Sequence, residues 1–475
     1  MNGSEHAEID FRHCDGADIA ELRGALGGEL LQPEDPAYED ERRVWNGTVD
    51  RWPALIAYCA GPDDVAHAVA FARSRDLPLS VRAGGHSAAG LSVADGGLVV
   101  DLSRMTDIRV NPGRRIARAA AGLTLGDFDR ATQAHGLATT MGVASTTGIA
   151  GLTLGGGFGK LGRKHGLACD NLLAAEVVTA DGRIQRASAE ENPDLFWGLR
   201  GGGGNFGVVT ALEYRLHPIG TELICASLIY GRAQARDGMR AWRDLVASAP
   251  DEISADAALA RGPSGEPVFN VSICHAGPED EAAAAVDRLL APLRAARPSD
   301  EQIGARSYLD VQSAADAVFP RGLRYYWKAQ FLDYLADGAI EVLLERFPAA
   351  PSSRALFVLQ QVGGAIARVP PGATAYFNRG AACDSFPVSI WEDPADDAAN
   401  VAWAQQLWTA LRPFAADGVY VNNLGDEGQQ RLRAAYGDNL PRLVAFKDRY
   451  DPSNLFRFNQ NIPSKPQTGT PRNEP

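Results

Sequence analysis

One histidine and one cysteine stand in or beside glycine-rich segments in the first half of the chain. The three segments are Arg82–Ser87, Gly148–Gly162 and Gly201–Gly207; His86 lies inside the first, and Cys169 follows the second. A lone histidine, a lone cysteine or one glycine turn is ordinarily structural. Glycine, however, leaves backbone N–H groups bare, so three such segments predict a cradle for an anion such as a pyrophosphate.

The third glycine segment also contains the spacing of a Rossmann fingerprint, at Gly202, Gly204 and Gly207. That fingerprint requires a strand before the glycines and a helix after them. Here the preceding residues 193–199 have a helical pattern, and the following residues 208–216 have a strand pattern. The context therefore disfavours a conventional NAD site or a Rossmann-type FAD site.

Strand and helix patterns alternate from about residue 54 to 218 and predict the elements that position these loops. We expect a polar, helix-prone lead-in over residues 1–47, with the folded core beginning after it. The expected helix is 63–75, and the expected strands are 79–81, 97–102, 174–179 and 207–216.

The middle of the chain has a different pattern and predicts a second domain over about 219–410. We expect helices at 279–296, 339–347 and 401–411 and a β run at 356–362. After residue 411 the pattern favours strands again. From residue 463 the composition is polar and predicts disorder.

Composition limits the classes of partner. The chain has 475 residues, 45% hydrophobic content and a formal net charge of −13, which favour a soluble globular protein and disfavour nucleic acid or anionic membrane as the main partner. The start Met1–His6 lacks a signal-peptide pattern, and no run approaches the roughly 20 apolar residues of a membrane span. We therefore expect a cytoplasmic protein. Six scattered cysteines without CxxC pairs argue against a structural zinc site, and no metal is expected.

Ordered motifs near both ends of the chain resemble those of one family. The chain resembles the FAD-linked oxidases of the berberine bridge enzyme-like group, within the vanillyl-alcohol oxidase and para-cresol methylhydroxylase superfamily, over roughly residues 30–463. The residues that carry this resemblance are Arg82–Ser87 with Gly90, Gly155–Gly159, Cys169–Asn171, Gly204–Thr210 and Tyr450–Phe456.

The resemblance implies an α+β fold in three parts. Residues 1–218 would form a two-subdomain FAD-binding domain. Residues 219–410 would form an inserted substrate domain, an antiparallel sheet covered by helices. Residues 411–475 would return to the FAD-binding domain.

The resemblance also implies FAD held by two covalent bonds, an 8α-histidyl bond at His86 and a 6-S-cysteinyl bond at Cys169. The neighbouring Lys164 and His165 are available to favour a thiolate at Cys169. Two tethers would permit an open pocket and raise the flavin potential. The residues that the resemblance places along the cofactor are Arg82, Ala83, Gly84, Gly85, Ser87, Thr147, Gly148, Gly151, Gly156, Asn171, Val208 and Asn459.

On the substrate side, Tyr420 matches the tyrosine that acts as base in sugar- and glycoside-oxidising relatives. A packing role beside the flavin is the alternative. Asn422, two residues on, would share one face of a strand with Tyr420 and orient the substrate. Tyr326 and Tyr376 are candidates for an aromatic pocket wall, although ordinary core packing explains both almost as well.

The expected function is FAD-dependent oxidation of a small alcohol, sugar, glycoside or secondary metabolite by hydride transfer, with oxygen as acceptor. Ile149 stands where a valine admits oxygen in typical oxidases, so a dehydrogenase stays an alternative. Lys160 is a second departure, because relatives often have an aromatic residue there. The same scaffold also supports a flavin-dependent oxygenase or cyclase, and a non-catalytic binding protein could retain it. Substrate identity and oligomeric state stay open.

Overall fold

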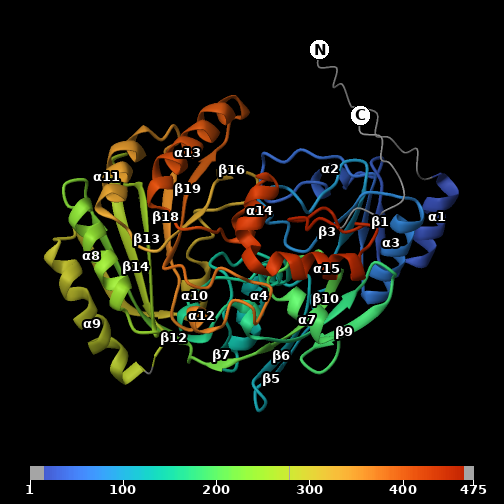
Figure 1. Ribbon diagram of the computed structural model, residues 1–475, viewed down its shortest axis with the longest axis horizontal. Helices are drawn as coiled ribbons and strands as arrows, with labels where there is room; N and C mark the ends of the chain where they lie inside the picture. Colours follow the sequence, from blue (N-terminus) through green and yellow to red (C-terminus); the bar gives the residue numbers. More distant parts are fainter. Residues whose placement is uncertain (1–14, 278, 465–475) are drawn as a thin grey trace.

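Three large β-sheets and a two-stranded ribbon organise the computed structural model, which describes residues 15–277 and 279–464 (Figure 1). The first sheet has three parallel strands and one antiparallel edge strand. Its strands are, in spatial order, β1 (Glu29–Leu31), β2 (Leu55–Tyr58), β4 (Leu98–Asp101) and β3 (Leu79–Arg82). The side chains of β2 and β4 are buried throughout, as in a parallel sheet covered on both faces.

The second sheet is antiparallel and follows in the sequence. It contains, in spatial order, β5 (Ile108–Asn111), β6 (Ile116–Ala120), β10 (Val208–Arg215), β8 (Leu172–Val178) and β9 (Ile184–Ser188). A short ribbon pairs β7 (Leu137–Ala138) with β11 (His217–Pro218). Helix α3 (Pro62–Ser74) contacts both of the first two sheets and joins them into one core.

The third sheet is antiparallel and is built entirely from strands between Glu222 and Trp391. Its spatial order is β15 (Asp300–Ser307), β12 (Glu222–Tyr230), β14 (Pro267–His275), β13 (Ile253–Arg261), β18 (Leu356–Gln361), β19 (Cys383–Trp391) and β16 (Arg324–Trp327), with β17 (Gln330–Leu332) also paired to β19. Its outer helices are α8 (Ala235–Ser248), α9 (Glu279–Ala295), α11 (Asp337–Arg346) and α13 (Asp397–Leu411), which lie together at the left of Figure 1.

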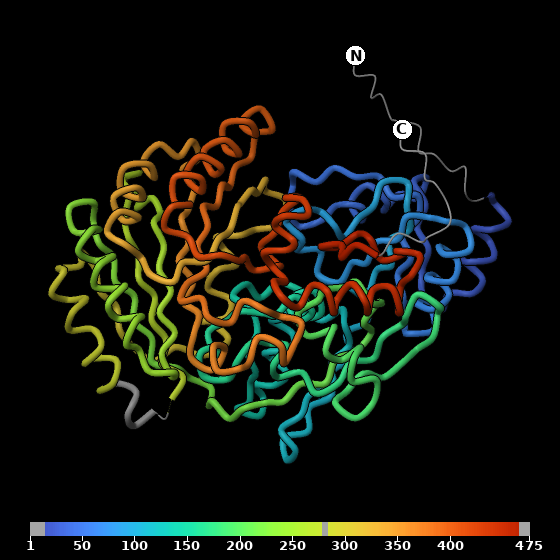
Figure 2. The backbone as a smooth tube through the Cα atoms, in the orientation of Figure 1, coloured from blue at the N-terminus to red at the C-terminus, as the bar shows by residue number. Residues whose placement is uncertain are grey.

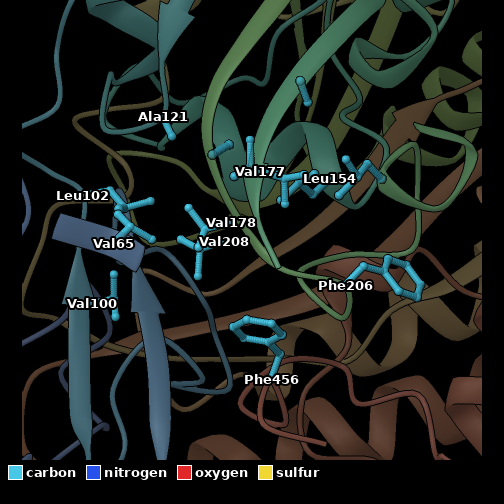
Figure 3. Close-up of a cluster of buried hydrophobic side chains, with 14 of the residues drawn as sticks. Val65, Val100, Leu102, Ala121, Leu154, Val177, Val178, Phe206, Val208 and Phe456 are labelled. Atoms are coloured by element: carbon cyan, nitrogen blue, oxygen red, sulfur yellow. The ribbon is translucent and has the colours of Figure 1, made fainter. Parts of the chain in front are cut away.

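After α13 the chain returns to the first two sheets. Helices α14 (Gly428–Tyr436) and α15 (Leu440–Tyr450) lie beside the N-terminal elements in the tube view (Figure 2). Figure 3 shows Phe456, which follows α15, in the same buried cluster as Val100, Val178 and Val208. The C-terminal segment is therefore part of the N-terminal core.

Most predicted elements are confirmed within a few residues, including the helix Pro193–Leu199, now α7, before the glycines and strand β10 after them. The mixed α+β architecture agrees with the expected fold class. The domain boundaries after residues 218 and 410 stay predictions. The predicted polar tail lies largely outside the described residues.

Two predictions are wrong. Residues 15–47 are not a lead-in, since Leu30, Leu31 and Tyr38 are buried and β1 pairs with β2. Strands do not return among residues 412–464, which form helices and turns. The alternating apolar residues near Tyr420 resemble a strand, but no neighbouring strand within the described ranges pairs with them.

Within residues 15–277 and 279–464, none of the helices combines the length and the apolar character needed to cross a bilayer.

Candidate active site

A cavity of about 420 Å³ opens between the glycine loops of the first half and the third sheet. The C-terminal segment closes its remaining side. Its walls include Trp45, Ala83, Gly84, Gly85, His86, Ser87, Thr147, Gly148, Gly151, Phe158, Gly204, Val208, Trp327, Gln360, Phe386, Tyr420, Asn422, Asn423 and Asn459. No Asp, Glu, Lys or Arg side chain lines this cavity among the described residues.

The first two glycine loops touch each other. A Cβ on Gly84 would lie 2.3 Å from the backbone nitrogen of Gly148, so neither loop accepts a side chain there. By contrast, a Cβ on Gly151 or Gly204 would meet nothing within 4 Å. These glycines leave bare backbone beside open cavity space, which is the arrangement that a pyrophosphate group needs. The amide oxygen of Asn459 is also buried without a hydrogen-bond partner, and the residues therefore fit FAD.

Arg82 does not line the cavity. Its guanidinium is buried, forms an ion pair with Asp101 at the end of β4 and donates to the carbonyl of Glu41. Arg82 therefore fixes the start of the first glycine loop and leaves Ala83 to Ser87 to face the cavity.

His86 lies on the cavity wall and stacks on Trp45, with ring centroids 5.0 Å apart. Its Nδ1 lies 3.5 Å from Oγ1 of Thr147, which contacts it from the second glycine loop. Burial lowers the pKa of His86 to about 4, so the imidazole is neutral at physiological pH. A neutral imidazole has a free ring nitrogen for covalent attachment to an electrophile.

Cys169 lies in a buried cluster with Phe158 and Tyr420 but is not among the lining residues. Burial raises the pKa of its thiol above the ordinary value. The expected activation by Lys164 and His165 is wrong: the Lys164 ammonium donates to the carbonyl of Ala276, and burial lowers the pKa of His165 to about 3. Lys164 and His165 are thus unavailable to Cys169, and its thiol lies 3.9 Å from the Asp170 carboxylate, which also raises its pKa.

The two residues that follow Cys169 in the motif, Asp170 and Asn171, have structural roles. Asp170 accepts two hydrogen bonds from the buried Arg379, at 2.7 and 2.8 Å. Asn171 donates to the carbonyls of His165 and Leu167 and contacts His217. Asn171 is absent from the cavity wall and its side-chain polar atoms bind other protein groups, so its contact with the cofactor stays a prediction.

The glycines at 155–157 make room for side chains. A Cβ on Gly155 would lie 1.8 Å from the Asn422 amide oxygen, and one on Gly156 would lie 2.9 Å from the Tyr376 ring. Gly156, predicted to line the cofactor, is absent from the cavity wall. The aromatic ring of Tyr376 occupies that position.

Tyr420 and Asn422 both line the cavity and meet there, although Asn422 lies within a short helical turn that begins directly after Tyr420, and not in a strand. The Tyr420 hydroxyl oxygen accepts hydrogen bonds from the Gly157 N–H at 2.9 Å and from Asn422 Nδ2 at 2.7 Å. Burial raises the pKa of Tyr420 above its ordinary value, and the two donated hydrogen bonds act in the opposite direction. Tyr420 is therefore a protonated phenol at neutral pH.

Strand β16 presents the neighbours of Tyr326 to the cavity side. Tyr325 stacks on Trp45 at 3.9 Å, and Trp327 lines the cavity, whereas Tyr326 accepts a hydrogen bond from Gln405 of α13. Successive strand residues point to opposite faces, so Trp327 lies on the cavity wall and Tyr326 does not, and a substrate contact at Tyr326 stays a prediction.

Tyr376 is also not on the cavity wall; it packs against Tyr420 in the buried cluster, with ring centroids 6.2 Å apart. The sequence reasoning missed Trp45 and Trp327 as cavity residues. For Trp45, the available signal was an aromatic residue directly before Asn46-Gly47. Only the fold shows that Trp45 stacks on His86.

A buried ion pair stabilises the turn that brings the C-terminal segment to the cavity. Lys447 and Asp451 are both fully buried, and their charged atoms are 2.7 Å apart. Asp451 also accepts hydrogen bonds from the backbone N–H groups of Leu455 and Phe456. This turn places Asn459 on the cavity wall.

The two departures from the family pattern lie beside the cavity without lining it. Ile149 is fully buried at the start of α5 (Ile149–Leu154). The ammonium of Lys160 lies 2.6 Å from the carboxylate of Asp256 in the third sheet. Lys160 therefore bridges the first half and the third sheet by an ion pair.

Comparison with known proteins identifies two family models in this chain. Residues 53–188 match the family model of an FAD binding domain, and residues 419–463 match the model described as berberine and berberine like. The chain is 31% identical to the FAD-linked oxidoreductase YgaK of Bacillus subtilis, over 92% of this chain and 97% of that protein.

Two solved structures share the fold. The 6-hydroxy-D-nicotine oxidase of Arthrobacter nicotinovorans superposes with a TM-score of 0.83 at 29% identity, covering 92% of this chain and 98% of that chain. The BBE-like 1 protein of Physcomitrella patens superposes with a TM-score of 0.86 at 24% identity, covering 94% and 100%. The chain is an enzyme and belongs to the berberine bridge enzyme-like family of FAD-linked oxidoreductases.

Proposed function

We propose that the protein oxidises an uncharged, small organic alcohol or amine, with FAD attached at His86 and molecular oxygen as the final acceptor. The observation that carries the proposal is the presence of His86 and Tyr420 on the walls of one cavity. In this proposal residues 1–218 and 411–475 hold FAD, and residues 219–410 complete the substrate side.

FAD, when bound, supplies the acceptance of two electrons from the substrate. The chain's own residues hold it at the glycine loops and at the C-terminal segment. These residues are Ala83, Gly84, Gly85, Ser87, Thr147, Gly148, Gly151, Val208 and Asn459.

Tyr420 handles the substrate proton. Its hydroxyl oxygen already accepts two hydrogen bonds, so its own O–H is free to point at a substrate oxygen or nitrogen. The same two donors stabilise negative charge on the oxygen when it acts as a base. Since burial keeps the phenol protonated at neutral pH, a base role predicts that kcat/KM rises as pH increases.

An uncharged substrate follows from the lining. A charged group would lose its hydration without meeting an opposite charge from the described side chains, at a cost of several kcal/mol. Trp45, Trp327 and Phe386 offer flat apolar surfaces that suit a planar ring. The Nε1 donor of Trp327 is buried without a partner and is available to a ligand. The relative named as an (R)-6-hydroxynicotine oxidase makes a neutral nitrogen heterocycle a reasonable first test.

The attachment is tested on acid-denatured protein by flavin fluorescence in a gel. Wild type, His86→Ala, Cys169→Ala and the double variant are compared. We expect flavin to stay with wild type and Cys169→Ala and to leave His86→Ala, because only His86 lines the cavity. Flavin retained by His86→Ala and lost from the double variant would instead establish the second bond at Cys169 that the family resemblance implies. Flavin lost from denatured wild type would refute covalent attachment.

The acceptor is tested by oxygen consumption and peroxide release during turnover. Turnover that needs an artificial acceptor would identify a dehydrogenase, and Ile149→Val would then be expected to increase oxygen use. Incorporation of labelled oxygen into product, or formation of a new ring, would identify an oxygenase or cyclase.

A further inference from the structure

Two cysteines face each other across neighbouring strands of the third sheet, away from the cavity wall. Cys225 of β12 is directly opposite Cys274 of β14 in the antiparallel register (the two strands are adjacent in Figure 1). The Cys225 thiol donates to the sulfur of Cys274, and the two Sγ atoms are 3.1 Å apart. Directly opposite residues have Cβ atoms about 4.5–5.5 Å apart, against about 3.8 Å in a disulfide. A bond between these cysteines therefore needs only a small local movement.

Charged groups of both signs surround the pair: Lys160 and Arg306 lower the pKa of Cys274, and Asp256 raises it. Hydrogen bonding from Cys225, together with the charge of Lys160, holds the pKa of Cys274 below its ordinary value. Lys160 is itself fixed by Asp256 at 2.6 Å. Arg306, on the edge strand β15, acts in the same direction as Lys160. A thiolate at Cys274 is thereby favoured, and the thiolate is the reactive form of cysteine.

A small molecule can approach the pair from the edge of the sheet. Gly304 of β15 stands opposite Cys225 on its other side and is exposed. A Cβ at Gly304 would meet nothing within 4 Å, so no side chain covers Cys225 from that position. Cys225 accordingly keeps 8% of its surface exposed, and Cys274 keeps 4%.

Two of the other described cysteines, Cys59 and Cys383, lack these features. Cys59 is fully buried, and its thiol donates to the carbonyl of Ala57. The Cys383 thiol donates to the carbonyl of Asp384. Burial raises the pKa of both thiols. Cys59 and Cys383 therefore serve as internal controls for reactivity.

We propose that Cys225 and Cys274 form a two-electron redox site that hydrogen peroxide converts to a cross-strand disulfide. One thiolate attacks peroxide, which breaks the O–O bond, gives a sulfenic acid and, with one proton, releases water. The second thiol then displaces the sulfenic oxygen as a second water, and the S–S bond forms. Overall, two thiols lose two electrons and two protons, and one peroxide becomes two waters. The site does not depend on the proposed function, since peroxide is added as a reagent.

The test uses the full-length native holoprotein, treated with hydrogen peroxide, alkylated in denaturant and digested with trypsin. Cleavage yields peptide 216–232, with Cys225 as its sole cysteine, and peptide 262–288, with Cys274 as its sole cysteine. We expect mass spectrometry to show these two peptides linked, with both cysteines losing alkylation at least tenfold faster than Cys59 and Cys383. Dithiothreitol is expected to restore alkylation.

Variants identify the partners. Cys225→Ser is expected to abolish the linked species, whereas Cys59→Ser and Cys383→Ser leave it unchanged. If Cys225→Ser does not fold, the presence or absence of the linked peptide in the wild-type protein still tests the proposal. The proposal is overturned if Cys225 and Cys274 stay alkylatable at the rate of the control cysteines, or if peroxide yields only sulfinic acid without the linked peptide.

Discussion

Two groups of glycines approach the cavity from the same half of the chain but leave space for different occupants. At Gly84 and Gly148 the two loops touch, and the nearby Gly151 leaves open space over bare backbone. At Gly155 and Gly156 the space is filled by the side chains of Asn422 and Tyr376. The first group is therefore suited to a ligand, while the second positions protein groups.

The difference teaches that a glycine motif reports only the absence of a side chain. Whether a cofactor or another residue fills the vacated volume depends on which distant segment arrives there. Substitutions at and behind these glycines sharpen or break this distinction.

The largest effect on catalysis is expected from substitution of Tyr420. Its hydroxyl accepts a hydrogen bond from Asn422, the side chain that fills the space at Gly155. Tyr420→Phe removes the hydroxyl that accepts from Gly157 but keeps the ring packed on Phe158, at a centroid distance of 4.2 Å. We expect kcat to fall about 100-fold or more, with flavin content retained. Steady-state kinetics measure the change. Tyr326→Phe, away from the cavity, is the matched control and keeps its activity; a Tyr420→Phe enzyme within about threefold of wild type would remove Tyr420 from the chemistry.

Gly84→Ala tests the contact between the loops of the first group. The new Cβ would overlap the backbone of Gly148, which cannot move aside easily, so we expect a loss of about 3 kcal/mol in the free energy of unfolding. Urea unfolding and flavin absorbance measure stability and cofactor content. Gly151→Ala should change stability by less than about 0.5 kcal/mol while weakening flavin binding. Equal stability losses in both variants would contradict the assignment of Gly151 to a ligand surface.

Two buried carboxyl groups, those of Asp129 and Asp384, are hydrogen-bonded to amide side chains. Gln312 links Asp129 to the carbonyl of Gly142, and Asn423 donates to Asp384. Burial raises the pKa of both carboxyl groups to about 7.

The sign of the pH effect follows from these raised pKa values. Between about pH 4 and 7 the native protein keeps protons that the unfolded chain releases, so the free energy of unfolding falls as pH rises. Asp129→Asn removes one of the two carboxyl groups. The free energy of unfolding should then fall by about 2 kcal/mol less between pH 5 and pH 7 than it does in wild type. Urea unfolding at pH 5, 6 and 7 measures it. An unchanged slope would show that Asp129 is ionised in the native protein.

Gly155→Ala should affect catalysis less than Tyr420→Phe does, because the atom in its way is the end of a flexible side chain. The Asn422 amide can swing away, but its hydrogen bond to Tyr420 is lost. We expect kcat/KM to fall about tenfold, about 1.4 kcal/mol, with flavin retained. In a double-mutant cycle, Gly155→Ala should add little to Asn422→Ala. Full additivity would show that the two residues act independently.

The sequence predicted the regular elements well because helix and strand patterns are local. The strand β10 after the third glycine segment and the helix α7 before it follow from residue periodicity alone. The glycine loops were also found from the sequence, since a nucleotide cradle uses contiguous backbone, and the family resemblance singled out His86.

Local pattern could not place the residues that face those loops. Trp45 meets His86 only after the chain folds back, and Cys169 enters an apolar cluster instead of the cavity wall. In β16 the register against β19 decided that Trp327 and not Tyr326 faces the cavity.

The sequence by itself therefore determined the elements, the glycine loops and the family, because these depend on short segments and their order. The tertiary structure alone decided which side chains meet: His86 with Trp45, Tyr420 with Asn422, and Cys225 with Cys274. Only long-range packing and strand register bring such groups within hydrogen-bonding or van der Waals distance, and these are properties of the whole fold.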